Sequence, residues 1–215
     1  TGSRRTSEES QAWTTQDMPP AVISPALSGV ASSNTRIVVV GRQKDPISMQ
    51  DTGLIMTSTD GITWTVVPDT IEAYLYAVIW AGNQFVAVGS GLTGGAIAIT
   101  SSDGLAWSTH SITSTVTAIR DIAWNGSRYV AVGLDGALTS LDGNTWQQTA
   151  NFASYAVAWS GHRFLAFGPV YAEHSTDGMN WTYTQMTRSS DVYGIAWNGA
   201  KWAVVGFNSL VATSP

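Results

Sequence analysis

The feature of this 215-residue chain that most constrains its fold is a segment of about ten residues that recurs along it. Four clear copies begin with Trp, carry Gly two residues later and end in an apolar run closed by a second Gly: 80–89, 124–133, 159–168 and 197–206. A weaker copy ends at Gly41, with Ser32 in place of the tryptophan. Apolar β-formers on both sides of an Asn-Gly or Ser-Gly pair are typical of a strand, a tight turn and a second strand. Each copy therefore predicts a β-hairpin.

A second repeated segment, Ser-x-Asp-Gly-x-x-Trp, occurs at 58–64, 101–107, 140–146 and 175–181. It predicts a turn followed by a strand that carries the tryptophan. Asp can accept hydrogen bonds from amides of its own turn and Gly tolerates a positive φ, so turn chemistry explains both residues without catalysis. We therefore expect structural roles for Asp60, Asp103, Asp142, Asp177, Trp64, Trp107, Trp146 and Trp181.

The spacing of these segments predicts a β-propeller. The four tryptophans of the second segment are 43, 39 and 35 residues apart, and repeats of this length with four strands are typical of propeller blades. The chain ends in the third strand of a blade, near 210–213, and residues 7–13 are a degenerate form of the missing turn and fourth strand. We predict a single all-β domain over 1–215: a five-bladed β-propeller of four-stranded antiparallel blades. The N-terminal outer strand would pair with the C-terminal strands to close it, and residues 1–6 would form a flexible tail.

The Ser-x-Asp-Gly-x-x-Trp turns resemble the Asp box, or bacterial neuraminidase repeat, of β-propellers that include sialidases. The resemblance covers nearly the whole chain. It implies that these turns join the third and fourth strands of each blade, away from the ligand-binding face. The Phe/Tyr-Arg-Ile-Pro signature of sialidases is absent, and sialidases have six blades, so sialidase activity is not expected. Small five-bladed lectins such as tachylectin are similar in size, which implies carbohydrate binding.

Composition excludes several other classes. With 10 Lys and Arg against 15 Asp and Glu, the chain lacks the dense basic face that a nucleic-acid partner requires. No segment approaches the roughly 20 apolar residues of a membrane span, so we expect no membrane insertion. The absence of Cys excludes disulfides and thiol catalysis, and the three histidines have no ligand spacing, so we expect no metal and no cofactor. We interpret the chain, which has neither an initiator Met nor a leader, as a mature form or an excised domain of a secreted or extracellular protein.

Variable loops identify a candidate binding face. The Trp-x-Gly turns and Asp-Gly turns repeat closely, whereas the loops between second and third strands and the connections between blades vary. At the start of the innermost strands, on the variable side, aromatic residues recur and offer stacking platforms for a sugar; alternatively, these tyrosines pack between blades. The candidate ligand-binding residues are Tyr76, Arg120, Asp121, Tyr155, Asp191 and Tyr193.

A second departure from the repeat is Glu173-His174. The other blades hold Met56, Ile99, Leu138 and Ala212 at the position of Glu173. An acid at a normally apolar position is costly unless it is paired. Glu173 is therefore either a functional carboxylate or a blade-edge residue that meets Arg163 or solvent.

These observations favour a non-catalytic recognition module that binds a glycan or cell-surface glycoconjugate, or another protein. One alternative is a protein-interaction or structural domain of a larger secreted protein. The other is a glycoside hydrolase, which requires two carboxylates roughly 5 to 10 Å apart. The acids on or near inner strands that could supply them are Asp121, Glu72 and Asp191.

Overall fold

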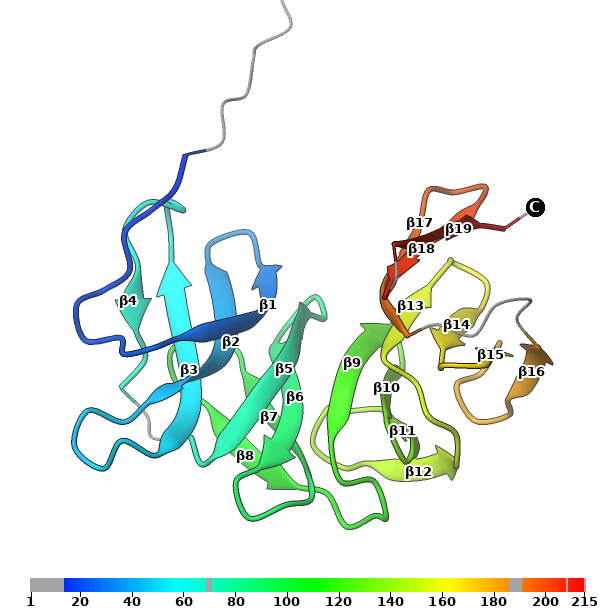
Figure 1. Cartoon of the computed structure of the whole chain (residues 1–215), viewed down its shortest axis with the longest axis horizontal. Coiled ribbons are helices and arrows are strands. Elements are labelled where there is room, and N and C mark those ends of the chain that lie inside the picture. The colour runs from blue at the N-terminus through cyan, green and yellow to red at the C-terminus, as the bar shows by residue number, and fades with distance from the viewer. Residues whose placement is uncertain (1–13, 69–70, 186–190, 208, 215) are drawn as a thin grey trace, which may run out of the picture.

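The computed structural model describes residues 14–68, 71–185, 191–207 and 209–214, and these form nineteen strands in five antiparallel sheets (Figure 1). Blade 1 contains β1 (Ala26–Ser32), β2 (Ile37–Lys44), β3 (Asp51–Ser58) and β4 (Thr65–Val66). Blade 2 contains β5 (Ala73–Trp80), β6 (Phe85–Gly91), β7 (Ala96–Ser101) and β8 (Ser108–Ser111). Blade 3 contains β9 (Ile119–Trp124), β10 (Tyr129–Gly133), β11 (Gly136–Ser140) and β12 (Gln147–Ala150). Blade 4 contains β13 (Ala156–Trp159), β14 (Phe164–Phe167), β15 (Tyr171–Ser175) and β16 (Thr182–Gln185), and blade 5 contains β17 (Val192–Trp197), β18 (Trp202–Gly206) and β19 (Leu210–Thr213).

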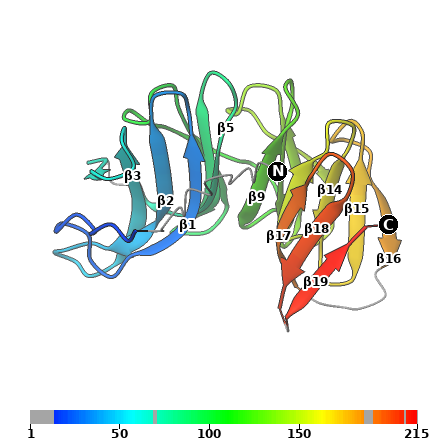
Figure 2. The same ribbon diagram turned by 90° about the horizontal axis from the view of Figure 1, so that it is seen from above.

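The blades follow one another around a ring, and within each blade the strands lie in sequence order from the centre outwards. The first strands of consecutive blades pack against each other, from β1 through β5, β9 and β13 to β17. This arrangement confirms the predicted five-bladed β-propeller. Blade 5 has three strands among the described residues; its predicted fourth strand, residues 7–13, lies outside them. In Figures 1 and 2, β1 and β17 stand on the two sides of an opening in the ring.

Hydrogen bonds within each Ser-x-Asp-Gly segment hold the turn between the third and fourth strands. In blade 4, Ser175 Oγ donates to Asp177 Oδ1 at 2.9 Å, and that oxygen accepts the amides of Met179 and Asn180 at 2.9 and 2.8 Å. The Gly178 amide donates to Ser175 Oγ, and Gly178 has a φ of 72° that favours glycine. The same bonds recur around Asp60, Asp103 and Asp142.

The tryptophans of these segments differ from the prediction in one respect. Each was expected on the fourth strand, but the fourth strand begins at the residue that follows it: Thr65, Ser108, Gln147 and Thr182. The turn extends through the tryptophan because the aspartate accepts amides from residues two and three positions ahead, which delays the start of the ladder. Three of the rings pack at the rims of the cores between blades: Trp107, Trp146 and Trp181.

The core lies between the blades, where the second strands alternate their side chains. Val40, Val88 and Val132 face the next blade and are fully buried, whereas Ala87 and Ala131 face the preceding blade. This two-residue period is the one that the repeated Val-Ala-Val sequence predicts for a strand buried on both faces.

The glycine that ends each second strand permits a close backbone approach. A Cβ at this position would collide with the carbonyl oxygen of a residue near the start of the first strand. The five pairs are Gly41 with Ala26, Gly89 with Tyr74, Gly133 with Ala118, Gly168 with Ala153 and Gly206 with Asp191. Contact between two backbones therefore explains why this glycine recurs.

Candidate functional site

A β-bulge interrupts the first strand of four blades at one equivalent position. The pairing between first and second strands skips one residue at each bulge: Ser28, Tyr76, Arg120 and Tyr193. In blade 4, Tyr155 occupies this place immediately before β13, and its amide donates to the Phe167 carbonyl at 3.0 Å. A bulged residue leaves the ladder and its side chain is re-aimed, a feature that is common beside functional sites. The bulges thus present the candidate residues at the start of the inner strands, beside the variable loops.

The candidate residues meet in pairs across neighbouring blades. The Arg120 guanidinium lies 4.3 Å from the centre of the Tyr76 ring, and Tyr76 Oη is 3.5 Å from Ser90 Oγ. The rings of Tyr155 and Tyr193 meet edge to face, with centroids 6.1 Å apart. Tyr193 is 59% exposed, so part of this aromatic surface is open to a ligand. We call Tyr76, Arg120, Tyr155 and Tyr193 the axial cluster.

The carboxylate of Asp121 is held by backbone amides and not by the axial cluster. Asp121 is half-buried, and its two carboxylate oxygens accept the amides of Ile122 and Val157, each at 2.8 Å. Burial raises the pKa of this carboxyl to about 6, although the two amide bonds oppose the shift. Asp121 therefore ties β9 to β13. Asp191 accepts the Phe207 amide through its main-chain carbonyl at 2.8 Å.

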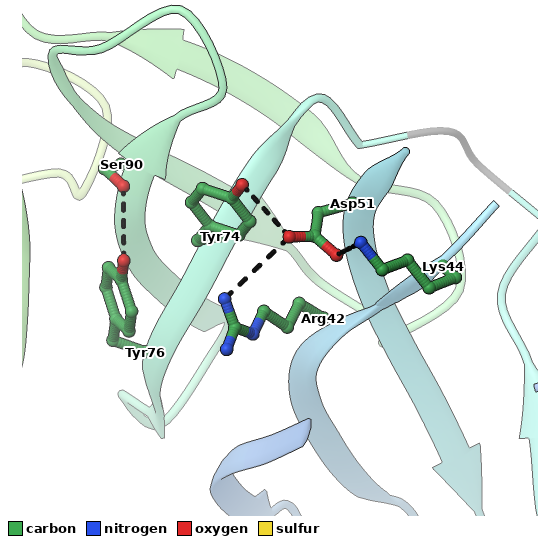
Figure 3. Close-up of polar contacts among 6 residues, drawn as sticks. All are labelled: Arg42, Lys44, Asp51, Tyr74, Tyr76 and Ser90. Carbon is green, nitrogen blue, oxygen red and sulfur yellow. Dashed lines mark hydrogen bonds and ion pairs between the residues drawn. The ribbon is translucent and has the colours of Figure 1, made fainter. Parts of the chain in front are cut away.

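A polar cluster at the β2–β3 loop was missed by the residue-level prediction, although the sequence marked this long loop as part of the variable face. Lys44 Nζ lies 2.8 Å from Asp51 Oδ1, and Tyr74 Oη donates to Asp51 Oδ2 at 3.3 Å (Figure 3). The Arg42 guanidinium lies 4.0 Å from Asp51 Oδ2 and 5.5 Å from the centre of the Tyr74 ring. The Lys44 ammonium holds the pKa of Asp51 below its usual range. Figure 3 shows that Tyr74 is directed toward blade 1, whereas Tyr76 is directed toward Ser90.

Glu173 lies at the interface between blades 3 and 4, not at an exposed blade edge. Its position in β15, paired with Ala166 and Tyr183, places it opposite blade 3, and it is only 4% exposed. Among the residues that the structure describes, no ion pair includes Glu173 and no donor reaches its Oε2. Contact with Arg163 or with solvent was therefore wrong as an expectation, because the Glu173 side chain is turned into the interface between blades 3 and 4 and is almost fully covered.

A pocket of about 330 Å³ opens beside Glu173. Its walls contain two edge-to-face aromatic pairs, Phe152 with Trp181 and Tyr171 with Tyr183, whose ring centroids are 5.1 and 5.2 Å apart. The volume falls within the range of small-molecule sites. His174, the other half of this departure from the repeat, bonds Thr182 Oγ1 through Nε2 at 2.9 Å.

The described ranges contain no group of three or more His, Asp or Glu side chains placed to hold a metal ion. Within the same ranges, no helix is long and apolar enough to cross a membrane. The four aspartates of the Ser-x-Asp-Gly turns are engaged by backbone amides. These amides hold the pKa of Asp60 at about 2 and lower those of the other three.

Comparisons with known proteins place this architecture among β-propellers. Models of known protein families and curated protein sequences give no match to the chain. The WD40 β-propeller domain of Doa1 is similar with a TM-score of 0.64 at 12% identity, over 89% of this chain and 65% of that one. A chain of a nidogen/laminin complex is similar with a TM-score of 0.62 at 10% identity, over 87% of this chain and 73% of that one. The Pyrococcus horikoshii acylaminoacyl peptidase is similar with a TM-score of 0.53 at 14% identity, over 85% of this chain and 35% of that one. At these identities the likeness shows the fold alone: the chain has the architecture of a β-propeller domain.

Proposed function

We propose that this propeller is a non-catalytic recognition module that binds a carbohydrate at the axial cluster, Tyr76, Arg120, Tyr155 and Tyr193. The observation that carries the proposal is the series of equivalent bulges, which releases three of these residues from the strand ladder at one end of the inner strands. Such a module would act outside the cell, where glycans and glycoconjugates are exposed. The similarity in size to small five-bladed lectins supports the same assignment.

The chemistry of the axial cluster suits a sugar ring. The apolar face of a pyranose can lie on an aromatic side chain, and the tyrosine hydroxyls and the guanidinium can bond its hydroxyl groups. The Arg120 guanidinium lies beside the Tyr76 ring, and Arg120 is half-buried. The loops between second and third strands differ among blades, from Asp45–Gln50 to the two residues between β10 and β11. This variation favours one or two sites over five identical ones.

The glycoside hydrolase alternative is weakened by the contacts of Asp121. A catalytic acid or nucleophile must reach the substrate, and a second carboxylate must lie roughly 5 to 10 Å away. Asp121 instead uses both carboxylate oxygens on backbone amides in the core. A hydrolase would therefore have to use other acids than the one that the sequence favoured.

A protein-interaction module is the second candidate function. It is favoured by the half-exposed cluster of Arg42, Lys44 and Asp51 on the same face, which offers charges of both signs to a protein surface. The likeness to a chain of the nidogen/laminin complex agrees with such a use of the fold. Capture of a protein partner by the full chain, lost in Lys44→Ala and unchanged in Tyr193→Ala, would favour this function over carbohydrate binding.

A glycan array tests the carbohydrate proposal. We expect the full chain to bind a subset of glycans, and Tyr193→Ala to weaken that binding about tenfold, or about 1.4 kcal/mol. Leu141→Ala is the control, because Leu141 is also exposed but lies in the turn between β11 and β12, on the opposite face. Circular dichroism and the unfolding midpoint would establish that both variants fold. Absence of binding to every glycan, or equal affinity in the Tyr193 variant, would contradict the proposal.

A further inference from the structure

Glu173 is an acid at a position that the fold otherwise fills with apolar side chains. Its equivalents by strand register are Met56, Ile99 and Leu138, each buried against the second strand of its own blade. Ile99 and Leu138 pack in cores between blades, and Met56 packs against other apolar residues of blade 1. At the interface of blades 3 and 4 the facing residues of blade 3 are small, Ala137 and Ala150, and a pocket stands where a large side chain would pack.

Glu173 is the acid among the residues that line this pocket. The carboxyl is buried, and no described residue donates to Oε2. Burial also raises the pKa of Glu173 to about 7, although the backbone amides of Glu173 and Gly168 oppose the shift. A buried carboxylate with one oxygen left without a donor is unfavourable, and a bound cation would relieve it.

The pocket walls favour an organic cation. Two edge-to-face pairs, Phe152 with Trp181 and Tyr171 with Tyr183, present aromatic faces and edges around the carboxyl. Aromatic faces attract ammonium groups through the ring quadrupole, most strongly where water is excluded. A divalent metal ion would need further oxygen ligands, and the described residues contain no such group of acids.

The geometry points to a binding site for a primary alkylammonium group in this pocket, with Glu173 Oε2 accepting its hydrogen bond and the two aromatic pairs enclosing its stem. One unpartnered oxygen matches a single N–H donor, whereas a guanidinium would need both oxygens for a bidentate pair. The pocket lies beside β12, β15 and β16, away from the first strands that carry the axial cluster. The inference therefore does not depend on carbohydrate binding there.

The ammonium group could belong to a lysine side chain or to an amino sugar. Trp181 Nε1 also lacks a partner among the described residues, so a hydroxyl acceptor next to the amine would add a second bond. The two probes are N-acetyl-lysine methylamide and glucosamine. Their uncharged counterparts are N-acetyl-norleucine methylamide and glucose, which keep nearly the same shape but lack the ammonium group.

Titration calorimetry with the full chain tests the site. We expect at least one of the two amines to bind, its uncharged counterpart to bind at least tenfold more weakly, and Glu173→Gln to weaken amine binding at least tenfold. Gln preserves the shape of the side chain, and Tyr183→Ala, which removes a half of one aromatic pair at the exposed side, provides a second variant that should also weaken binding. Asp17→Asn makes the same change of charge at an exposed position and should leave amine binding unchanged.

The results separate the ligand sources and the two proposals. Binding of lysine alone assigns a peptide source, and binding of glucosamine alone assigns an amino sugar; both support the site. Failure of both amines, equal binding of the uncharged counterparts, or undiminished binding by folded Glu173→Gln would overturn it. Tyr193→Ala tests carbohydrate binding at the axial cluster, and Glu173→Gln tests amine binding in the pocket. A negative result for one site therefore does not decide the other.

Discussion

Glu173 is a buried carboxyl and Asp121 a half-buried one, and their neighbours assign them different roles. Burial raises the pKa of each, to about 7 and about 6. Asp121 accepts two backbone amides at 2.8 Å and thereby links two blades. Glu173 Oε2 lacks a donor within the described part of the chain and borders a pocket. The hydrogen-bond donors that surround a residue, rather than its type or its place in a repeat, decide whether it supports the fold or remains available to a ligand.

Glu173→Gln should change the pH dependence of stability. The carboxyl has a pKa of about 7 when folded against 4.5 in its ordinary environment, so the folded state retains a proton that the unfolded state releases. Stability contributed by this group is therefore present below about pH 4.5 and is lost as the pH rises to about 7. Because Gln does not titrate, the free energy of unfolding of the variant relative to wild type should rise by about 3 kcal/mol between pH 4 and pH 8.

Urea denaturation at the two pH values measures this difference, with Asp17→Asn as the control for a lost charge. Parallel pH profiles for wild type and Glu173→Gln would show that Glu173 has an ordinary pKa and is well solvated.

Some elements of this fold are determined by residues that are close in sequence, and others by contacts between residues that are far apart in sequence. The Ser-x-Asp-Gly turns could be predicted from sequence because their hydrogen bonds join residues at most three positions apart, as around Asp177. The hairpins could be predicted because each tight turn lies between two adjacent apolar runs. The five blades followed from the repetition of these units. The bulges at Tyr76, Arg120 and Tyr193 could not be predicted, because they depend on contact between two strands.

The same distinction applies to the candidate site. The sequence identified Tyr155 and Tyr193 by their equivalent positions, and the structure brings their rings together. It grouped Asp121 with them because sequence position does not reveal where a carboxyl points or which amides it accepts. The departure at Glu173 was visible in sequence, but its pocket depends on small residues of blade 3 and on Phe152 from a connection between blades.

Gly133→Ala tests the close approach between the first and second strands of a blade. A Cβ at Gly133 would collide with the Ala118 carbonyl oxygen, a backbone atom that cannot move without disturbing β9 and its bulge. We expect this variant to lose roughly 3 kcal/mol or more in free energy of unfolding. Gly94→Ala is the comparison: its φ is 96° and its Cβ would meet nothing within 4 Å, so it should lose only about 1 to 2 kcal/mol. Equal losses in urea denaturation would refute the close-approach explanation.

At the scale of the whole molecule, the faces of blades 1 and 5 at the opening of the ring are apolar but uncovered. Val205 of β18 is 52% exposed and Val30 of β1 is 66% exposed. A shallow apolar hollow, lined in part by Leu27, Val30 and Val39, lies on the β1 face. Faces of this kind on a soluble protein mark surfaces that contact something.

The repeat identifies what covers these faces. Val205 is equivalent to Val40, Val88 and Val132, and Val30 is equivalent to Val78, Ile122 and Val157. In three interfaces, one member of each set lies in the same buried core: Val40 with Val78, Val88 with Ile122, and Val132 with Val157. The repeated geometry predicts that Val205 packs against Val30 when blade 5 meets blade 1 and the ring closes.

Cross-linking of positions 30 and 205 tests most directly whether blades 1 and 5 meet to close the five-bladed ring. The chain has no native cysteine, so Val30→Cys with Val205→Cys provides a single pair of thiols for a short bifunctional maleimide. We predict efficient intramolecular cross-linking in the folded protein and none in the control pair Leu141→Cys with Val205→Cys. Free thiols or cross-links between molecules alone, in a variant that unfolds like wild type, would contradict closure of the ring by blades 1 and 5.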